Sequence, residues 1–400
     1  MTRSPLVLMI VLATLAPAYS QVVTCNVSPA AAPFVRADGA SELVSDVVMT
    51  CTSIGPSVSV NVNIQIFLNV NLTSRIMNPI TKASEGLLLI DEPQPGVANI
   101  SNGFPYFGQV LGTPGVPAGT AGSGNVYQAT VLSDNTIVWL GVPFVTGGTR
   151  TFRMTNIRGN ATLLGGSGPI LSDVAISGPA SVAIANPVST VAQAANGLKF
   201  TSSTPASGIL DLRFEELFPS AFKKRIENTL GGPLTASYQD VPSVAYCTES
   251  GFTPEFSVLT PGAIGSANTG TRLLAQISSV PSSVFVFIVP NEVTSSSGNL
   301  VAHRVFPPLG SNFAGGTVST FGGFSLEFVT AAHTAELLYE VTASAPFLGK
   351  NGCAPIDAFN IQVFGFFPQP LASAVVKGHL APVDPTPKAS ATAPEPRFVP

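Results

Sequence analysis

Residues 58–72, VSVNVNIQIFLNVNL, decide the fold class of this 400-residue chain. Apolar side chains stand at every second position of the segment, and the positions between them hold Ser, Asn, Gln and a single Phe. Successive side chains of a β-strand point to opposite faces, so a period of two gives one apolar face and one face of amides and hydroxyls. The segment is therefore predicted to be a half-buried β-strand.

Strand patterns recur along the whole chain, whereas helical spacing is rare. Residues 215–227 and 331–338 are the helix candidates, although Pro219 would have to lie in the first turn of the former. The strand candidates are residues 43–52, 86–90, 127–132, 136–140, 151–157, 182–184, 209–214, 271–277, 284–289, 324–328, 337–341 and 359–364. We expect an all-β chain of two β-sandwich domains, immunoglobulin-like or related, with few short helices.

Residues 1–20 have the features of a secretory signal peptide. Arg3 precedes an apolar stretch, and small residues precede the expected cleavage between Ser20 and Gln21. Residues 201–208 hold no charge and no large apolar side chain, which is typical of a linker. We therefore expect an N-terminal domain over residues 21–200, a linker over 201–208, a C-terminal domain over 209–380, and a disordered Pro-rich tail over 381–400.

The chain carries few charges for a soluble protein. Charged residues make up 10% of it and its net charge is −4, whereas soluble domains usually contain about 25% charged residues. Uncharged polar side chains must therefore cover much of the surface, and the acidic balance argues against binding of nucleic acid. No segment after the signal offers about 20 uncharged apolar residues, so we expect a secreted chain, extracellular or periplasmic, without a transmembrane segment.

Four cysteines in an exported chain predict two disulfides, for which three pairings exist. We favour Cys25 with Cys51 and Cys247 with Cys353, because each pair then lies within one predicted domain. Closing the shorter loop should stabilise the fold by roughly 3 kcal/mol. A metal site is disfavoured, since the chain has no Cys-x-x-Cys motif and no His near a Cys.

Motifs for catalysis are missing from the sequence. There is no Gly-x-Ser-x-Gly motif, and the few histidines lack the spacing of a zinc site: His303, His333 and His379. Asp91 and Glu92 are neighbours on an extended segment and would point apart, while Glu215 and Glu216 precede a basic stretch and suit a solvated surface. We predict no catalytic residue and no enzymatic activity.

A calcium ion is the one cofactor that the sequence suggests. Asp38, Glu42 and Asp46 lie close together around Gly39, where a turn could gather oxygen ligands. The spacing is not that of an EF-hand, and Arg36 offers the alternative of an ion pair with one of these carboxylates. A calcium site and an ion pair both fit the sequence.

Exposed aromatic side chains are a second candidate for binding. Residues 93–124 are rich in Gly and Pro and are predicted to form a long loop or a protruding hairpin. Within it, Tyr106 and Phe107 are flanked by Pro105 and Gly108 and are candidates for contact with a ligand. Anchoring of the loop is the alternative role.

Several segments make the chain resemble a known group of sequences. The resemblance is carried by residues 25–27, 35–39, 42–46, 51–52, 71–75, 88–93, 139–143, 218–223, 248–252 and 270–273, for example LLIDEP at 88–93 and WLGVP at 139–143. These segments are similar to those of uncharacterised exported two-domain proteins of acidobacterial soil bacteria. The resemblance covers most of the mature chain, but it implies no activity and no catalytic residue.

Taken together, the sequence predicts a non-enzymatic protein of the cell exterior with a structural, adhesive or interaction role. A glycan- or peptide-binding module, calcium-dependent or not, is the alternative, and a secreted hydrolase is a further one. The partner would be an extracellular protein or a polysaccharide. Self-association is also open, because polar strands with few charges lack the usual protection against pairing with another copy.

Overall fold

The structure is a computed structural model. It describes residues 23–29, 31–74, 76–78, 80–91, 112–116, 124–179, 182–206, 208–219, 221–222, 271–278, 285–298, 300–305, 319–321, 323–329, 335–343, 356–366 and 375–380. The predicted signal peptide and the Pro-rich tail lie outside these residues. Within the described residues the regular secondary structure is β-strand apart from one short 3-10 helix, η2 (Ala161–Leu164), which agrees with the predicted all-β class.

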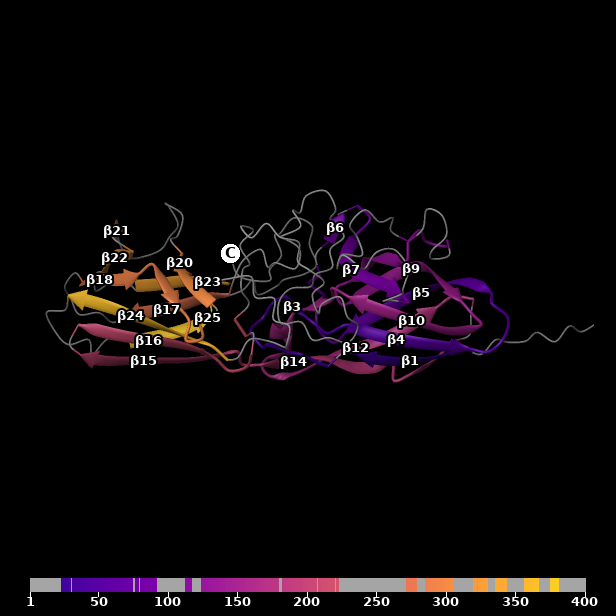
Figure 1. Cartoon of the computed structure of the whole chain (residues 1–400), viewed down its shortest axis with the longest axis horizontal. Coiled ribbons are helices and arrows are strands. Elements are labelled where there is room, and N and C mark those ends of the chain that lie inside the picture. Colours follow the sequence, from indigo (N-terminus) through magenta and orange to yellow (C-terminus); the bar gives the residue numbers. More distant parts are fainter. Residues whose placement is uncertain are drawn as a thin grey trace, which may run out of the picture.

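The first group of strands forms a sheet folded around one core (Figure 1). Its members are β1 (Val23–Pro29), β2 (Phe34–Arg36), β3 (Glu42–Leu43), β4 (Val47–Ser53), β5 (Ser59–Leu68), β6 (Ile76–Asn78), β7 (Ala83–Ile90), β8 (Val126–Ser133), β9 (Thr136–Val145), β10 (Gly148–Thr155), β11 (Arg158–Gly159), β12 (Gly168–Ser177), β13 (Val182–Ala185) and β14 (Val188–Ala195). The order is β13-β1-β4-β10-β7-β8-β9-β5-β12-β14-β2, with β6 beside β7; β3 and β11 pair separately.

The two halves of this long sheet share their interior. Buried Met49 of β4, Ile64 of β5 and Val191 of β14 belong to the same apolar core, although their strands are far apart in the sheet order. Phe144 of β9 stacks on Phe152 of β10 with ring centroids 5.6 Å apart. The sheet is therefore folded over, so that its inner faces pack against each other.

Strand β5 confirms the period of two that was predicted for residues 58–72. Val62, Ile64 and Ile66 are buried on its inner face, while Asn61 and Gln65 lie on the outer face. β5 pairs with β9 on one side and with β12 on the other, both antiparallel. The predicted strand continues to residue 72, but β5 ends at residue 68, where the backbone turns away from the sheet.

The second group of strands forms a sandwich of two antiparallel sheets. Its members are β15 (Leu198–Ala206), β16 (Ile209–Glu216), β17 (Arg272–Ser278), β18 (Phe285–Pro290), β19 (Glu292–Thr294), β20 (Leu300–Arg304), β21 (Ser319–Phe321), β22 (Phe324–Val329), β23 (Ala335–Ala343), β24 (Ala358–Phe366) and β25 (Val375–Leu380). One sheet has the order β15-β16-β24-β18-β22-β21 and the other has the order β19-β20-β23-β17-β25. Both contribute to one core, in which Phe214 and Phe359 face Leu273 and Tyr339.

The structure corrects the predicted linker. Residues 201–206 are part of β15, which pairs with β16 and opens the second sandwich. The chain instead passes between the two cores through Asn196 and Gly197, because Ala194 is buried in the first core and Leu198 packs against the second. A polar, small-residue composition suits an exposed edge strand as well as a linker, and the composition alone does not separate the two.

Both predicted helices are wrong where the structure describes them. Residues 215–216 end β16, and the described residues that follow, 217–219 and 221–222, form bends and turns. Residues 335–338 of the second candidate belong to β23. Within the described residues, no helix has the length and apolar character to cross a membrane.

Candidate functional site

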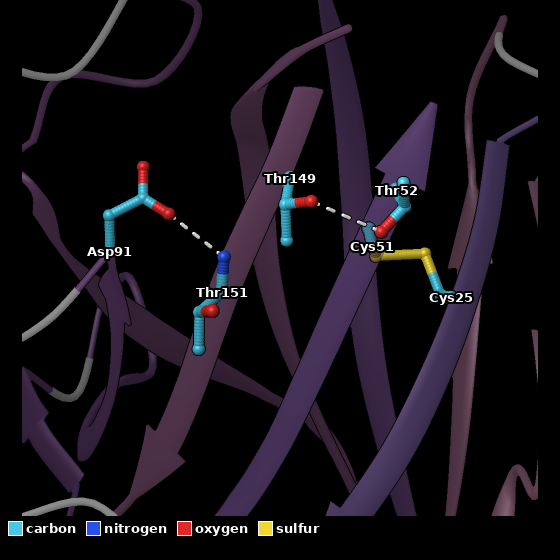
Figure 2. The surroundings of a disulfide bond; sticks show 6 residues. All are labelled: Cys25, Cys51, Thr52, Asp91, Thr149 and Thr151. Atoms are coloured by element: carbon cyan, nitrogen blue, oxygen red, sulfur yellow. Dashed lines mark hydrogen bonds between the residues drawn. A yellow bond between two sulfur atoms is a disulfide. The ribbon is translucent and has the colours of Figure 1, made fainter. Parts of the chain in front are cut away.

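A disulfide ties β1 to β4 at the inner face of the first sheet (Figure 2). Cys25 and Cys51 lie directly opposite each other in the strand register, and both are almost fully buried. Their pairing confirms the first predicted disulfide. Cys247 and Cys353 lie outside the described residues, so the second disulfide stays a prediction.

The opposite side of the same strands carries two rows of uncharged polar side chains, here called the hydroxyl face. In each row the register aligns one residue each from β1, β4 and β10. The first row is Thr24, Thr52 and Thr149. The second row is Asn26, Thr50 and Thr151. The first row is exposed throughout, and the hydroxyls of its members Thr52 and Thr149 lie 3.3 Å apart (Figure 2). The two rows together form a flat, uncharged array that consists mainly of hydroxyl groups.

The hydroxyl face could have been found from sequence spacing. Residues 50–52 read TCT and residues 149–151 read TRT, and two threonines at spacing two lie on the same face of a strand. What sequence spacing does not give is the register that places β10 beside β4 and aligns the rows. These residues are neither ionisable nor aromatic, so they do not have the features by which the candidate site residues were predicted.

One ion pair lies at the border of the hydroxyl face. Arg150 contacts Asp91 at 2.5 Å, and the other carboxylate oxygen of Asp91 accepts a hydrogen bond from the Thr151 backbone at 2.8 Å (Figure 2). The two side chains neutralise each other.

Several ionised side chains of the first group are buried in pairs. Three Arg–carboxylate pairs have arginine side chains that are 5% exposed or less: Arg36 with Glu42, Arg153 with Asp46, and Arg158 with Glu85. A buried charge must be paired with a charge of opposite sign, because an isolated charge in a protein interior costs much free energy. These pairs join segments that lie as far as 107 residues apart in the chain.

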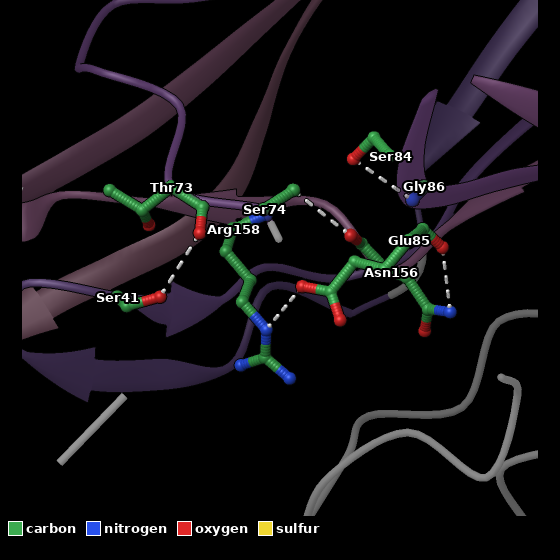
Figure 3. Close-up of polar contacts among 8 residues, drawn as sticks. All are labelled: Ser41, Thr73, Ser74, Ser84, Glu85, Gly86, Asn156 and Arg158. Atoms are coloured by element: carbon green, nitrogen blue, oxygen red, sulfur yellow. Dashed lines mark hydrogen bonds and ion pairs between the residues drawn. The ribbon is translucent and has the colours of Figure 1, made fainter. Parts of the chain in front are cut away.

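A network of polar contacts surrounds Arg158 (Figure 3). Its guanidinium donates to Glu85 at 3.0 Å, and its backbone N–H donates to the Ser74 hydroxyl at 2.9 Å. Ser74 in turn donates to the backbone carbonyl of Asn156, whose side chain donates to the Glu85 carbonyl. Asn156 has a φ of 59°, a left-handed conformation that Asn adopts more readily than most residues. The network holds three separate segments together.

The predicted calcium ligands are used differently in the structure. Glu42 pairs with Arg36, as the alternative interpretation suggested, and Asp46 pairs with Arg153. Within the described part of the chain, no three His, Cys, Asp or Glu side chains gather where they could share a metal ion. Asp38, Glu42 and Asp46 are therefore not brought together into a site.

Other predicted binding and carboxylate residues are placed as follows. Tyr106 and Phe107 lie outside the described residues. Glu215 and Glu216 separate to the two faces of β16: Glu215 pairs with Arg213 at 3.2 Å, and buried Glu216 accepts hydrogen bonds from two backbone N–H groups. Among the histidines, His303 lies 3.7 Å from Glu292 on the neighbouring strand.

A second polar cluster lies in the second group, at the start of β24. The carboxylate of buried Asp357 accepts hydrogen bonds from the hydroxyls of Ser296 and Ser297 and from the Ser297 backbone. Burial raises the pKa of Asp357, but the hydrogen bonds from Ser297, Ser295 and Ser296 outweigh it and hold the pKa below its ordinary value. The cluster stabilises the turn at residues 295–298.

No family model and no curated protein sequence matches the chain. Among solved structures, the C-terminal domain of the AgI/II polypeptide BspA of Streptococcus agalactiae aligns with 90% of this chain and 99% of its own, at 8% identity and a TM-score of 0.25. A partial N-terminal region of an enterococcal surface protein aligns with 83% of this chain and 87% of its own, at 11% identity and a TM-score of 0.17. Scores this low do not show a shared fold, so no property of either protein is transferred.

Proposed function

We propose that this chain is an exported, non-enzymatic protein of the cell exterior that holds flat, uncharged faces toward a partner surface in a structural or adhesive role. One observation carries the proposal: the first group of strands buries Arg36, Arg153 and Arg158 in ion pairs, while the hydroxyl face presents rows of Thr and Asn. Such a face offers hydrogen-bond donors and acceptors to a partner. Because it is uncharged, it does not repel a charged partner at long range.

The rigidity of the hydroxyl face supports contact with a partner. Threonine is β-branched and has few rotamers, and the Cys25–Cys51 disulfide fixes β1 against β4 beneath the rows. Little side-chain freedom is therefore lost when the face binds, which favours affinity for a flat partner such as a polysaccharide or the surface of an extracellular protein.

Retention of the purified chain on immobilised polysaccharides and extracellular proteins tests this proposal. Replacing both Thr52 and Thr149 by Lys places two like charges directly opposite each other in the exposed row, and we expect retention to fall about tenfold or more. The melting temperature should fall modestly, because like charges at opposed positions of a sheet are destabilising. Thr294→Lys, at an exposed position of β19, is the control and should bind as the wild type does. Equal retention of all three proteins, or none by the wild type, would contradict the proposal.

A further inference from the structure

Strand β15 has an open hydrogen-bonding edge. Among the strands that the structure describes, it is the first of its sheet and pairs with β16 alone, and Figure 1 shows it at the lower border of the second group. The other terminal strands of the large sheets, β2, β13, β19, β21 and β25, have six residues or fewer, whereas β15 has nine. Residues 201–206 are all exposed. Proteins usually keep edge strands short to prevent pairing with other chains.

The pairing of β15 with β16 fixes which backbone groups point outward. Leu198 lies opposite Glu216, so the next opposed pair of the ladder is Gly197 and Leu217. This pair is hydrogen-bonded, since Leu217 donates its backbone N–H to the Gly197 carbonyl at 3.1 Å. In an antiparallel ladder, hydrogen-bonded pairs alternate with non-hydrogen-bonded pairs, so residues 199, 201 and 203 direct their backbone groups to β16. Phe200 and Ser202 therefore direct theirs to the open side.

The features that protect edge strands lie at the two ends of β15. Lys199 is near its start, and Pro205 lies within the register shift between Ser203 and Ala206. The segment between them, residues 200–203, contains no charge and no proline. It is this middle segment that is free to accept another strand.

We infer that the open edge of β15 binds β15 of a second copy of this chain, antiparallel, with Thr201 opposite Thr201 on a two-fold axis. In this register Phe200 of each copy lies opposite Ser202 of the other, and these are the residues whose N–H and C=O groups point outward. Four backbone hydrogen bonds form, and the two sheets join into one continuous sheet. The inference concerns self-assembly and does not depend on the adhesive role proposed above.

Side chains and charges fit this arrangement. The two Thr201 side chains meet as a cross-strand Thr–Thr pair, which is a favourable combination on a sheet surface. The two Lys199 side chains lie opposite the Ser203 positions, so about 14 Å separates them along the strands, which is beyond the Debye length at physiological salt. A second copy thus supplies complementary groups without like-charge repulsion.

Sedimentation or light scattering of the full chain over a concentration series tests the inference, and the wild type should approach twice its monomer mass. Ser202→Pro removes an outward N–H that makes no hydrogen bond among the described residues. By symmetry two intermolecular hydrogen bonds are lost, so we expect dimerisation to weaken about tenfold or more. Ser202→Ala keeps the N–H and should dimerise like the wild type. A wild type that stays monomeric, or a Pro variant that dimerises like the Ala variant, overturns the inference.

Cross-linking tests the register itself, and it does not depend on how well the Pro variant folds. Non-hydrogen-bonded partners lie about 4.5 Å apart at their Cα atoms, which is within the range of a disulfide. Thr201→Cys should therefore form an intermolecular disulfide on oxidation, whereas Ser203→Cys should not, because about 14 Å separates the two copies of residue 203. Oxidised wild type shows the background from native cysteines. Cross-linking of Ser203→Cys alone would contradict the register.

Discussion

The pair of Arg153 and Asp46 shows how much a single buried residue can matter. Arg153 is 1% exposed and Asp46 is fully buried. Arg153→Met would leave a carboxylate in the interior without this guanidinium, and we expect the free energy of unfolding to fall by about 3–5 kcal/mol in urea titrations. Adding Asp46→Leu removes the unpaired buried carboxylate and should restore most of the lost free energy of unfolding.

A matched control for this prediction is Arg150→Met. The Arg150 side chain in the ion pair with Asp91 is 37% exposed, so solvent already screens the charges and the loss should stay within about 1 kcal/mol. Equal effects of the Arg150 and Arg153 variants, or a double variant no more stable than Arg153→Met, would show that burial of the charge is not the cause.

At this residue scale, sequence reasoning reaches some pairs and not others. Cys25 and Cys51 are found because only four cysteines exist and two of them lie close together in one predicted domain. Arg36 and Glu42 are six residues apart, and the alternative to calcium was an ion pair of Arg36 with one of the three nearby carboxylates, although the sequence did not say which. The partner of Arg153 is 107 residues away in sequence, and only the register of β10 against the rest of the sheet brings the two together.

At the scale of elements, the disulfide between β1 and β4 should set the stability of the first group. It spans 26 residues of sequence, and by the chain-entropy argument its removal costs roughly 3 kcal/mol. For a unit of this size, that corresponds to a fall of about 6–12 °C in melting temperature. The measurement is calorimetry of Cys25→Ser with Cys51→Ser. An unchanged melting temperature would mean that the β1–β4 ladder alone fixes the strands.

The turn at residues 295–298 should make the second group sensitive to acid through Asp357. The folded-state pKa of this carboxyl lies below its unfolded value of about 4, so its contribution to stability is complete above that value and is lost as pH falls through the folded pKa. We expect wild type to exceed Asp357→Asn in stability most clearly at pH 6, and the difference to shrink toward pH 3. Denaturant titrations at several pH values measure it, and a difference independent of pH would contradict the assignment.

Elements with a clear period were predictable, whereas those decided by long-range contacts were not. β5 and β24 alternate strictly and were both expected as strands. The segment after β16 was mistaken for a helix because Phe218 and Phe222 are four residues apart, the spacing of one helical face. Both side chains are buried in the second core, but the backbone that carries them is irregular. This backbone is held in place by the hydrogen bond from the Phe222 N–H to the Glu216 carboxylate at 2.6 Å.

At the scale of the whole molecule, the connection between the two cores should be stiff. Only Asn196 and Gly197 lie between β14 and β15, and a side chain at Gly197 would meet both Arg36 and Ala221, one from each group. The rings of Phe34 and Phe218 add a contact between the groups, with centroids 5.6 Å apart. Short, packed connections of this kind resist the relative motion that is usual for domains joined by a polar linker.

Small-angle scattering, at concentrations too low for self-association, checks this stiffness. Inserting four Gly and Ser residues between Asn196 and Gly197 gives a flexible segment with an end-to-end distance of about 13 Å, so we expect a broader distance distribution than in the wild type. Phe34→Ala, which removes one ring and keeps the short connection, should give a smaller change, because an aromatic pair contributes about 0.5–1.5 kcal/mol. A wild-type profile as broad as that of the insertion variant would mean that the two groups already move independently. In that case the hydroxyl face and the β15 edge would not be held in a fixed relation, and each would have to act on its own.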